Sequence, residues 1–371
     1  MGFTLYKEDP YLRENSRPLL RAPSFDPTTT PGPMLLRLLP CLLFGVSNTL
    51  AIIAPKVFIF TMFDLEANAW FGIPEFNVLE QNITVPGFSP LYPDAHCTSD
   101  GVVCLLTTGQ AEINAAATIS ALVYSRTFNL TSTYFLVAGI AGINPKVTTI
   151  GSVTFARYAV QVALQYEIDA REIPAQFPTG YFPQGSTAPG QMPGSWDGTE
   201  HRAFLKGASA PSIVLCDTAT SDVYWSGNLL GEAFENTTTI FTNGSATYCT
   251  TQQEDSATLG VLMRATMFHL VDFSRIIIMR SASDFDRPYP GQNGVANLLG
   301  DAPGINPSLL NLHLAGVKVI QGIVNEWDNK YAHGVQADNY IGDVFGSLGG
   351  EPDFGPGSIF KGSRITSWLY L

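Results

Sequence analysis

The segment at residues 275–288 places acidic and hydroxyl side chains directly after an apolar run. The apolar part, residues 276–279, has the length and composition of a buried strand in a parallel sheet. Ser283 and Asp284 follow it, and ligands of open α/β sheets bind beyond the carboxyl ends of such strands. A carboxyl group at the edge of a cleft can hold a proton and donate it to a substrate. The alternative role for Asp284 is local, as a helix cap or in a turn before Pro288.

Three other segments carry residues that could complete a site with this acid. Glu66 comes soon after an apolar strand expected at residues 56–62, and residues 139–145 form a glycine-containing tight turn after a second expected strand. Glu254 and Asp255 open the helix that precedes the last strand. Because ligands of such sheets gather at the carboxyl ends of the strands, we expect these segments to lie around one cleft.

Strands and helices alternate along the chain, which indicates an α/β fold with a mostly parallel sheet. No internal repeat and no second core are evident, so residues 53–371 are expected to form a single domain. The remaining elements are expected as helices at 110–124, 256–272 and 306–327, a loop at 177–198, a helical region at 201–208, short strands at 223–242 and a last helix at 338–348.

The composition is that of an ordered globular protein, since 45% of the 371 residues are hydrophobic and 14% are charged. The net charge is −12. Without a basic stripe the chain cannot release counterions from a phosphate backbone, so nucleic acid is excluded as a partner. The five histidines are scattered and no Cys/His spacing matches a metal site, so we expect neither a metal ion nor a cofactor.

The N-terminal 52 residues differ from the rest of the chain. Residues 1–33 are polar and rich in Pro and Arg, which predicts a disordered leader. Residues 34–52 resemble a secretory signal peptide, which would place the translation start at Met34 rather than at the first residue. A signal anchor and a buried helix are the alternatives, since Arg37 and Pro40 leave the apolar run shorter than a membrane span. We expect a secreted or cell-surface chain without a stable transmembrane domain.

Cysteines and glycosylation sequons agree with the secretory pathway. One cysteine lies in the signal-like segment, and an even remainder suits two disulfides, Cys97 with Cys104 and Cys216 with Cys249. The alternative is buried free thiols. Four Asn-x-Ser/Thr sequons could accept glycans in that pathway: Asn82, Asn129, Asn236 and Asn243.

Three segments in this order resemble the nucleoside phosphorylase and nucleosidase superfamily: KVFIFTMFDLEANAW at 56–70, FLVAGIAGINP at 135–145 and RSASDFDRP at 280–288. Within it, the chain is most similar to the fungal purine nucleoside permease family, whose members share this core and have secretory leaders. The resemblance covers roughly residues 56–287. It implies a three-layer αβα fold with a mostly parallel mixed central sheet, and a purine nucleoside as the ligand.

The resemblance implies a role for each matched residue. Asp284, with Ser283, would hold the purine and protonate its N7, because the C1′–N9 bond breaks more easily when the base leaves as a neutral molecule. Glu66 would activate the attacking water from the far face of the sugar. The acid that grips the ribose hydroxyls would be Asp255, or Glu254 if the register shifts by one residue.

The glycine turn is the next matched feature. Gly139, Ala141 and Gly142 fall in the turn that lies beneath the sugar and the oxyanion site in the superfamily. Ile140 stands where a serine is usual, so one polar contact of this turn is missing. The backbone of such a turn can still approach a ligand closely.

Phosphate binding is where the chain departs from the phosphorylases. Those enzymes have a glycine-rich phosphate loop after the first strand, whereas residues 62–66 of this chain are bulky and acidic. Arg280 and Arg287 could bind phosphate in its place, but Arg275 and Arg280 flank a buried strand and could equally form structural ion pairs. We therefore favour water over phosphate as the nucleophile.

Two functions of different classes follow. A carrier that spans the membrane would need many apolar helices of about 20 residues, and the sequence has at most one. The first function is a nucleosidase, or a phosphorylase, that cleaves purine nucleosides outside the plasma membrane. The second is a nucleoside-binding component of an uptake system without turnover. Both carboxyl groups, Glu66 and Asp284, favour catalysis, and the sequence allows a homo-oligomer without requiring one.

Overall fold

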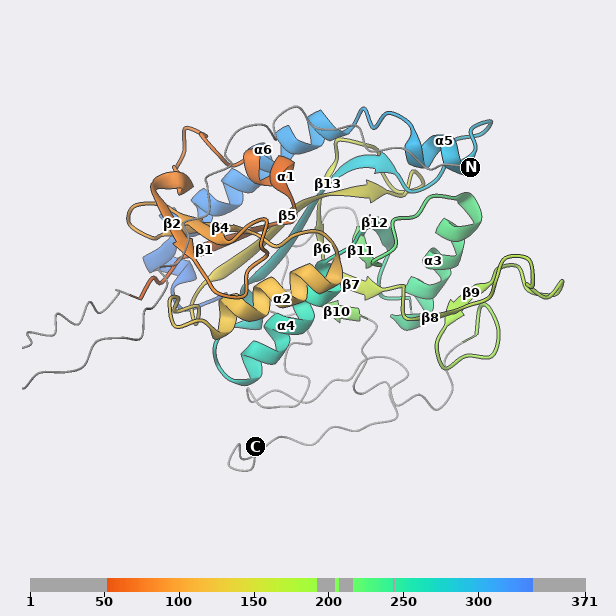
Figure 1. Ribbon diagram of the computed structural model, residues 1–371, viewed down its shortest axis with the longest axis horizontal. Helices are drawn as coiled ribbons and strands as arrows, with labels where there is room; N and C mark the ends of the chain where they lie inside the picture. The colour runs from red at the N-terminus through yellow and green to blue at the C-terminus, as the bar shows by residue number, and fades with distance from the viewer. Residues whose placement is uncertain (1–51, 192–203, 207–215, 243, 336–371) are drawn as a thin grey trace, which may run out of the picture. The chain divides into compact units, whose positions relative to one another are not determined.

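The computed structural model describes residues 52–191, 204–206, 216–242 and 244–335 (Figure 1). The leader at 1–33, nearly all of the signal-like segment at 34–52, Asn243 and the helix expected at 338–348 lie outside the described residues. Within the region expected to be helical at 201–208, residues 204–206 form a short strand instead.

A mixed central sheet forms the middle of the described fold. At its centre β1 (Val57–Thr61) lies parallel to β4 (Val103–Thr107) on one side and to β5 (Tyr134–Ile143) on the other. β5 also pairs in parallel with β13 (Ile276–Phe285) and antiparallel with β12 (Tyr248–Gln252). The remaining strands of this sheet are β2 (Gln81–Thr84), β3 (Asp94–Cys97), β6 (Val153–Ala156), β7 (Tyr158–Gln161), β10 (Phe204–Lys206) and β11 (Asp217–Thr220). The two-stranded pair β8 (Gln165–Glu167) and β9 (Tyr181–Pro183) is separate.

Helices cover both faces of the sheet, as Figure 1 shows. Side chains alternate along β1: Phe58 and Phe60 join one apolar cluster, whereas Val57 and Ile59 join another. The first cluster includes side chains of α2 (Ala111–Tyr124) and α4 (Asp255–Met267), and the second includes those of α1 (Asp64–Asn68) and α6 (Ile305–Asn325). All five residues of β1 are buried, as expected for a strand packed on both faces. The expectation of an α/β fold with a mixed central sheet is confirmed.

Two strands are longer than their apolar runs predict. β13 continues past Met279 to Phe285, and β5 continues through Gly139 to Ile143, so the tight turn expected at 139–145 is largely strand. The two strands pair with each other along this whole length, with Phe285 opposite Ile143. The backbone hydrogen bonds between β5 and β13 therefore continue beyond the apolar residues of the two strands. They can do so because the polar side chains that follow have partners within the protein.

The short strands expected at 223–242 are wrong for most of that segment. Residues Asn228–Phe241 form α3, which buries Phe234, Thr238 and Phe241 on one face. Spacings of four and three residues suit a helix, and their burial outweighs the strand propensity of the three consecutive threonines. The other helical segments of the described residues are short: α5 (Gly294–Leu299), 3₁₀ turns at Val78–Glu80 and Phe273–Arg275, and a π-helical turn at Trp327–Tyr331.

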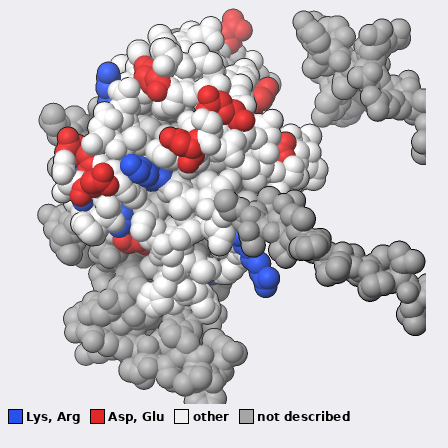
Figure 2. Space-filling model, turned by 90° about the vertical axis from the view of Figure 1, so that its left-hand side faces the viewer, with Lys and Arg blue, Asp and Glu red and all other residues white. Residues whose placement is uncertain are grey.

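The surface and the helices bear on two classes of partner. On the face drawn in Figure 2, Lys and Arg side chains lie singly among acidic and uncharged ones and form no stripe. None of the helices in the described part of the chain combines the length and apolar character that a bilayer crossing requires.

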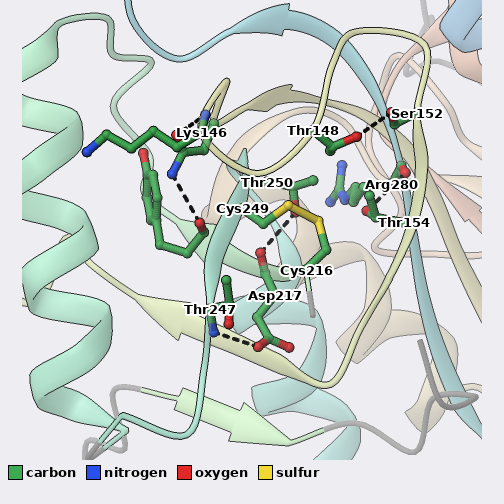
Figure 3. The surroundings of a disulfide bond; sticks show 12 residues. Lys146, Thr148, Ser152, Thr154, Cys216, Asp217, Thr247, Cys249, Thr250 and Arg280 are labelled. Carbon is green, nitrogen blue, oxygen red and sulfur yellow. Dashed lines mark hydrogen bonds between the residues drawn. A yellow bond between two sulfur atoms is a disulfide. The ribbon is translucent and has the colours of Figure 1, made fainter. Parts of the chain in front are cut away.

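Both expected disulfides are present. Cys97–Cys104 joins β3 to β4, with the two cysteines directly opposite each other in the register. Cys216–Cys249 joins the residue before β11 to β12. Figure 3 shows the second disulfide beside Asp217, which accepts a hydrogen bond of 2.8 Å from the backbone N–H of Thr247. Together they fasten the strands on either side of the parallel centre.

The two disulfides are expected to stabilise the fold unequally. They span 7 and 33 residues, and the chain-entropy model gives a cost of removal of about 2 kcal/mol for the short loop and about 4 kcal/mol for the long one. Replacing both cysteines of each pair with alanine and measuring urea denaturation would test this. Equal losses for the two pairs would contradict it.

Candidate functional site

A cavity of about 240 Å³ lies at the carboxyl ends of β1, β5 and β13, which is the end of the sheet where α/β folds bind ligands. Its volume lies just below the usual range of ligand pockets, about 300–1,000 Å³. Residues after β1, in β5, in β13, at 224–225 and at 251–254 line it. The segments that the sequence analysis expected around one cleft therefore meet here, apart from individual side chains described below.

Glu66 lies in α1, directly after β1, and is 1% exposed. Its two carboxyl oxygens accept hydrogen bonds of 2.7 Å from the backbone N–H groups of Met62 and Ile140. Burial raises the pKa of Glu66 to about 8, although Arg280 acts in the opposite direction. This carboxyl group is therefore mostly protonated at neutral pH and becomes a base in mildly alkaline solution.

Gly139 allows this close approach of Glu66 to β5. A Cβ atom at Gly139 would lie 2.9 Å from Glu66 Oε1 and 2.5 Å from Arg280 Nη1. Both distances are shorter than a real Cβ contact allows. The backbone of β5 at Gly139 is therefore packed directly against the side chains of Glu66 and Arg280.

Asp284 lies near the end of β13 and is half-buried. The register between β13 and β5 shifts at this point, from Ala282 opposite Ala141 to Asp284 opposite Gly142, and such bulges redirect side chains. Asp284 Oδ1 accepts a hydrogen bond of 2.7 Å from the hydroxyl of Ser283, and Oδ2 accepts one of 2.7 Å from the hydroxyl of Tyr224. Burial and the neighbouring Asp284 raise the pKa of Tyr224, so this hydroxyl remains a donor.

Arg280 forms the buried centre of a charge cluster with two acids. It is 1% exposed and contacts Asp255 through Nη2 at 2.5 Å and Nε at 3.3 Å, and Glu254 through Nη2 at 3.3 Å. Burial lowers the pKa of Arg280, but Asp255 and Glu254 outweigh burial and hold it above its ordinary value. Burial also raises the pKa of Glu254. Glu254 lines the cavity, whereas Asp255 is fully buried and is not among the lining residues.

The start of α4 positions this cluster without using the two acids as caps. The side-chain carbonyl of Gln252 accepts the backbone N–H groups of Glu254 and Asp255 at 2.7 and 2.8 Å. The amide nitrogen of Gln252 donates to the hydroxyls of Thr218 and Thr220. Gln252 thus caps the start of α4, and it leaves both carboxylates available to Arg280.

The family model for purine nucleoside permeases matches residues 54–204 and 201–336. A purine nucleoside permease of Candida albicans is 44% identical over 348 residues, covering 83% of this chain and 85% of the relative. This chain belongs to the purine nucleoside permease family. A probable purine nucleoside permease of Schizosaccharomyces pombe is 38% identical over 324 residues, covering 76% of this chain and 93% of the relative.

Among solved structures, the chain is similar to the MTA/SAH nucleosidase of Streptococcus pneumoniae in complex with 8-aminoadenine. That likeness has a TM-score of 0.45 at 14% sequence identity and covers 72% of this chain and 98% of the nucleosidase. Sequence relatives, and not this structural likeness, place the chain in the purine nucleoside permease family.

The residues expected at the site of this permease-family chain divide into two groups. The structure brings Glu66, Ala141, Gly142, Glu254, Ser283 and Asp284 to the cavity. Gly139, Asp255 and Arg287 are not among the residues that line it. Arg287 instead bonds Asp286 through Nε at 2.8 Å and lies over the ring of Tyr248. Arg287 Nη1 also lies 3.6 Å from Glu235 Oε2 of α3. This second ion pair fastens the end of β13 to α3, where Gly231 leaves room for the guanidinium group.

The sequence analysis missed Tyr224. Tyr224 is 56% exposed and lies at the rim of the cavity, while its hydroxyl reaches inward to Asp284. It lies in a segment expected to form strands, and nothing in its local sequence relates it to an acid 60 residues away. Tyr224 reaches the cavity because β11, which precedes it, pairs with β12, and β12 in turn pairs with β5. Within the described residues, no group of three or more His, Cys, Asp or Glu side chains is arranged to hold a metal ion.

Proposed function

We propose that this member of the purine nucleoside permease family binds purine nucleosides in the cavity and cleaves their N-glycosidic bond outside the plasma membrane. One observation supports this most: two carboxyl groups, Glu66 and Asp284, line the same cavity. Glu66 bonds the N–H of Ile140, and Asp284 lies opposite Gly142 in the register. These points are two residues apart on β5, a rise of about 7 Å. The two carboxyl groups therefore reach the cavity at different points along β5, which suits an acid and a base that act on different parts of one nucleoside.

The chemistry needs each group in one role. Asp284, as the acid, transfers its proton to N7 of the purine while the C1′–N9 bond breaks and its electron pair goes to the base. The resulting carboxylate is stabilised by the hydroxyls of Tyr224 and Ser283. A water oxygen bonds to C1′ and gives its proton to Glu66, so the products are free base and ribose. Glu254 faces the cavity and accepts hydrogen bonds from ribose hydroxyls.

The pH dependence follows from Glu66. As the base it must be ionised, and its pKa of about 8 means that the limb of the kcat/KM profile that Glu66 controls should rise with pH and have its midpoint near pH 8. The measurement is base release between pH 6 and 9. Glu66→Gln should lose the rise, whereas Asp64→Asn, an exposed acid of the same short helix, should keep it. A flat profile in the unmodified chain would contradict this role.

Base release is the experiment that tests the proposal. The full chain, made in a secretory host, is incubated with adenosine, inosine and guanosine, and free base is measured by chromatography. Release that depends on the chain would support cleavage. Absence of both release and binding would refute the proposal. The two disulfides support an extracellular setting, since disulfides persist in oxidising compartments.

A second candidate function is nucleoside uptake without turnover. Its support is the name of the relatives, which are called permeases at up to 44% identity. The chain would then supply the nucleoside-binding part of an uptake system. Nucleoside binding without release of free base, at any pH between 6 and 9, would favour this function over cleavage.

A further inference from the structure

Two features beside the cavity could hold an anion, and the first is Arg280. It is the single Lys or Arg side chain among the described residues that line the cavity. A guanidinium group has five N–H donors. Those of Arg280 go to Asp255 Oδ1 and Oδ2, Glu254 Oε2, the carbonyl of Ile140 at 3.1 Å and the sulfur of Met62 at 4.0 Å. No donor of Arg280 is left for a phosphate.

The second feature is the N-terminus of α2, a helix of 14 residues. Free backbone N–H groups and the helix dipole make such an end attractive to anions. Here the N–H of Ala111 donates to Glu254 Oε1 at 3.0 Å, and the N–H of Glu112 donates to Asp222 Oδ1 at 2.7 Å. Ala111 has a φ of 73°, which is uncommon for a residue other than glycine. These two carboxylates therefore occupy the place that an anionic ligand would take.

The charge of the cavity also disfavours an anionic ligand. Glu66, Glu254 and Asp284 face it and Asp255 lies behind it, against the single positive charge of Arg280. Four carboxyl groups therefore surround one guanidinium group. An incoming phosphate would meet like charge without a free donor to offset its desolvation.

We infer that the carboxylates of Glu254 and Asp222 act as built-in anion substitutes, so that the cavity admits uncharged nucleosides and rejects inorganic phosphate and 5′-phosphorylated nucleosides. This inference rests on the proposed nucleoside function and selects water, not phosphate, as the nucleophile. The sugar product is then free ribose, and ribose 1-phosphate does not form.

The test combines binding and product analysis on the full chain. Calorimetric titrations use inosine, inosine 5′-monophosphate and inorganic phosphate in turn, and cleavage of inosine is followed with 0 and 20 mM phosphate. We expect the monophosphate to bind at least 100-fold more weakly than inosine, and phosphate to change neither the rate nor the product. Ribose 1-phosphate as a product, or measurable phosphate binding to the chain alone, would overturn the inference. Failure to bind inosine would instead overturn the proposed function, and the phosphate titration would still be decisive.

A gain of phosphate binding is the sharper arm of the test. Asp222→Ala combined with Glu254→Ala removes both carboxylates, and with them both acceptors, from the end of α2, and phosphate should then bind with a dissociation constant in the millimolar range. Asp328→Ala removes one exposed acid from the turn at Trp327–Tyr331. That turn packs on Tyr134 at the start of β5, at the opposite end of the strand from the cavity, so this variant should gain nothing. If the double variant fails to fold, Asp222→Ala alone, at an exposed residue, still frees the N–H of Glu112. Unchanged phosphate affinity in a folded variant would contradict the inference that these carboxylates take the place of an anionic ligand.

Discussion

Asp284→Asn should lower kcat for base release by about 10²–10⁴-fold, the usual contribution of a positioned acid. Asparagine keeps the shape of the side chain and can still accept the hydroxyl of Tyr224, but it has no proton to give to N7. Nucleoside affinity should therefore change much less than kcat. Steady-state kinetics and calorimetry on the same preparation separate the two effects.

Asp286→Asn is the matched control, two residues further along. Asp286 is 1% exposed and is not among the residues that line the cavity. It accepts hydrogen bonds of 2.8 Å from the guanidinium group of Arg287 and of 2.7 Å from the hydroxyl of Tyr248. Its replacement should lower the melting temperature and leave kcat per folded molecule unchanged. If Asp284→Asn kept kcat within about threefold of the unmodified chain, Asp284 would not be the acid.

Arg280→Met should lower the free energy of unfolding by about 3–5 kcal/mol, because it leaves the carboxylates of Asp255 and Glu254 buried without their partner. Urea denaturation measures the change. The loss should also grow with pH. Burial raises the pKa of Glu254 and Arg280 lowers it, so removing Arg280 raises this folded-state pKa further above the unfolded value, and stability falls as pH rises through the unfolded pKa. The difference from the unmodified chain is therefore smaller at pH 4 than at pH 7.

Two further variants separate lost charge pairing from lost packing. Arg264→Met removes an exposed arginine of α4 and should change stability by no more than about 0.5 kcal/mol. Adding Asp255→Asn to Arg280→Met should recover part of the loss, since the amide removes one unpaired buried charge. A single Arg280→Met variant as stable as the unmodified chain would show that the buried ion pairs contribute no net stability.

The sequence predicted the elements that carry strong apolar patterns. Residues 57–61 are a buried strand and residues 111–124 a helix, as their composition indicates. Because parallel strands share one edge of a sheet, Glu66 and Asp284 could be placed at a common cavity from the order of the elements alone. This worked because each side chain directly follows, or ends, a strand.

The remaining parts depend on pairs that are distant in the sequence. The apolar pattern could not show that β13 continues to Phe285, because an arginine usually marks the end of a buried strand. Arg280 is tolerated inside β13 because Asp255 lies beside it. The resemblance favoured Asp255 over Glu254 as the acid that faces the ligand, whereas Glu254 lines the cavity. The side chain of Gln252, bonded to the backbone of both acids, fixes which of them faces the cavity. Tyr224 follows β11, whereas Asp284 lies in β13, so no local sequence pattern predicts their hydrogen bond.

The tight contact at Gly139 limits how this site could change. A methyl group there would press on Arg280 and on Glu66 at once, so one substitution would disturb both the buried ion pairs and the proposed base. Stability and chemistry cannot be varied independently at that position. The exposed rim around Tyr224 has no such double constraint. A library aimed at altered base preference should therefore randomise the rim and leave β5 as it is.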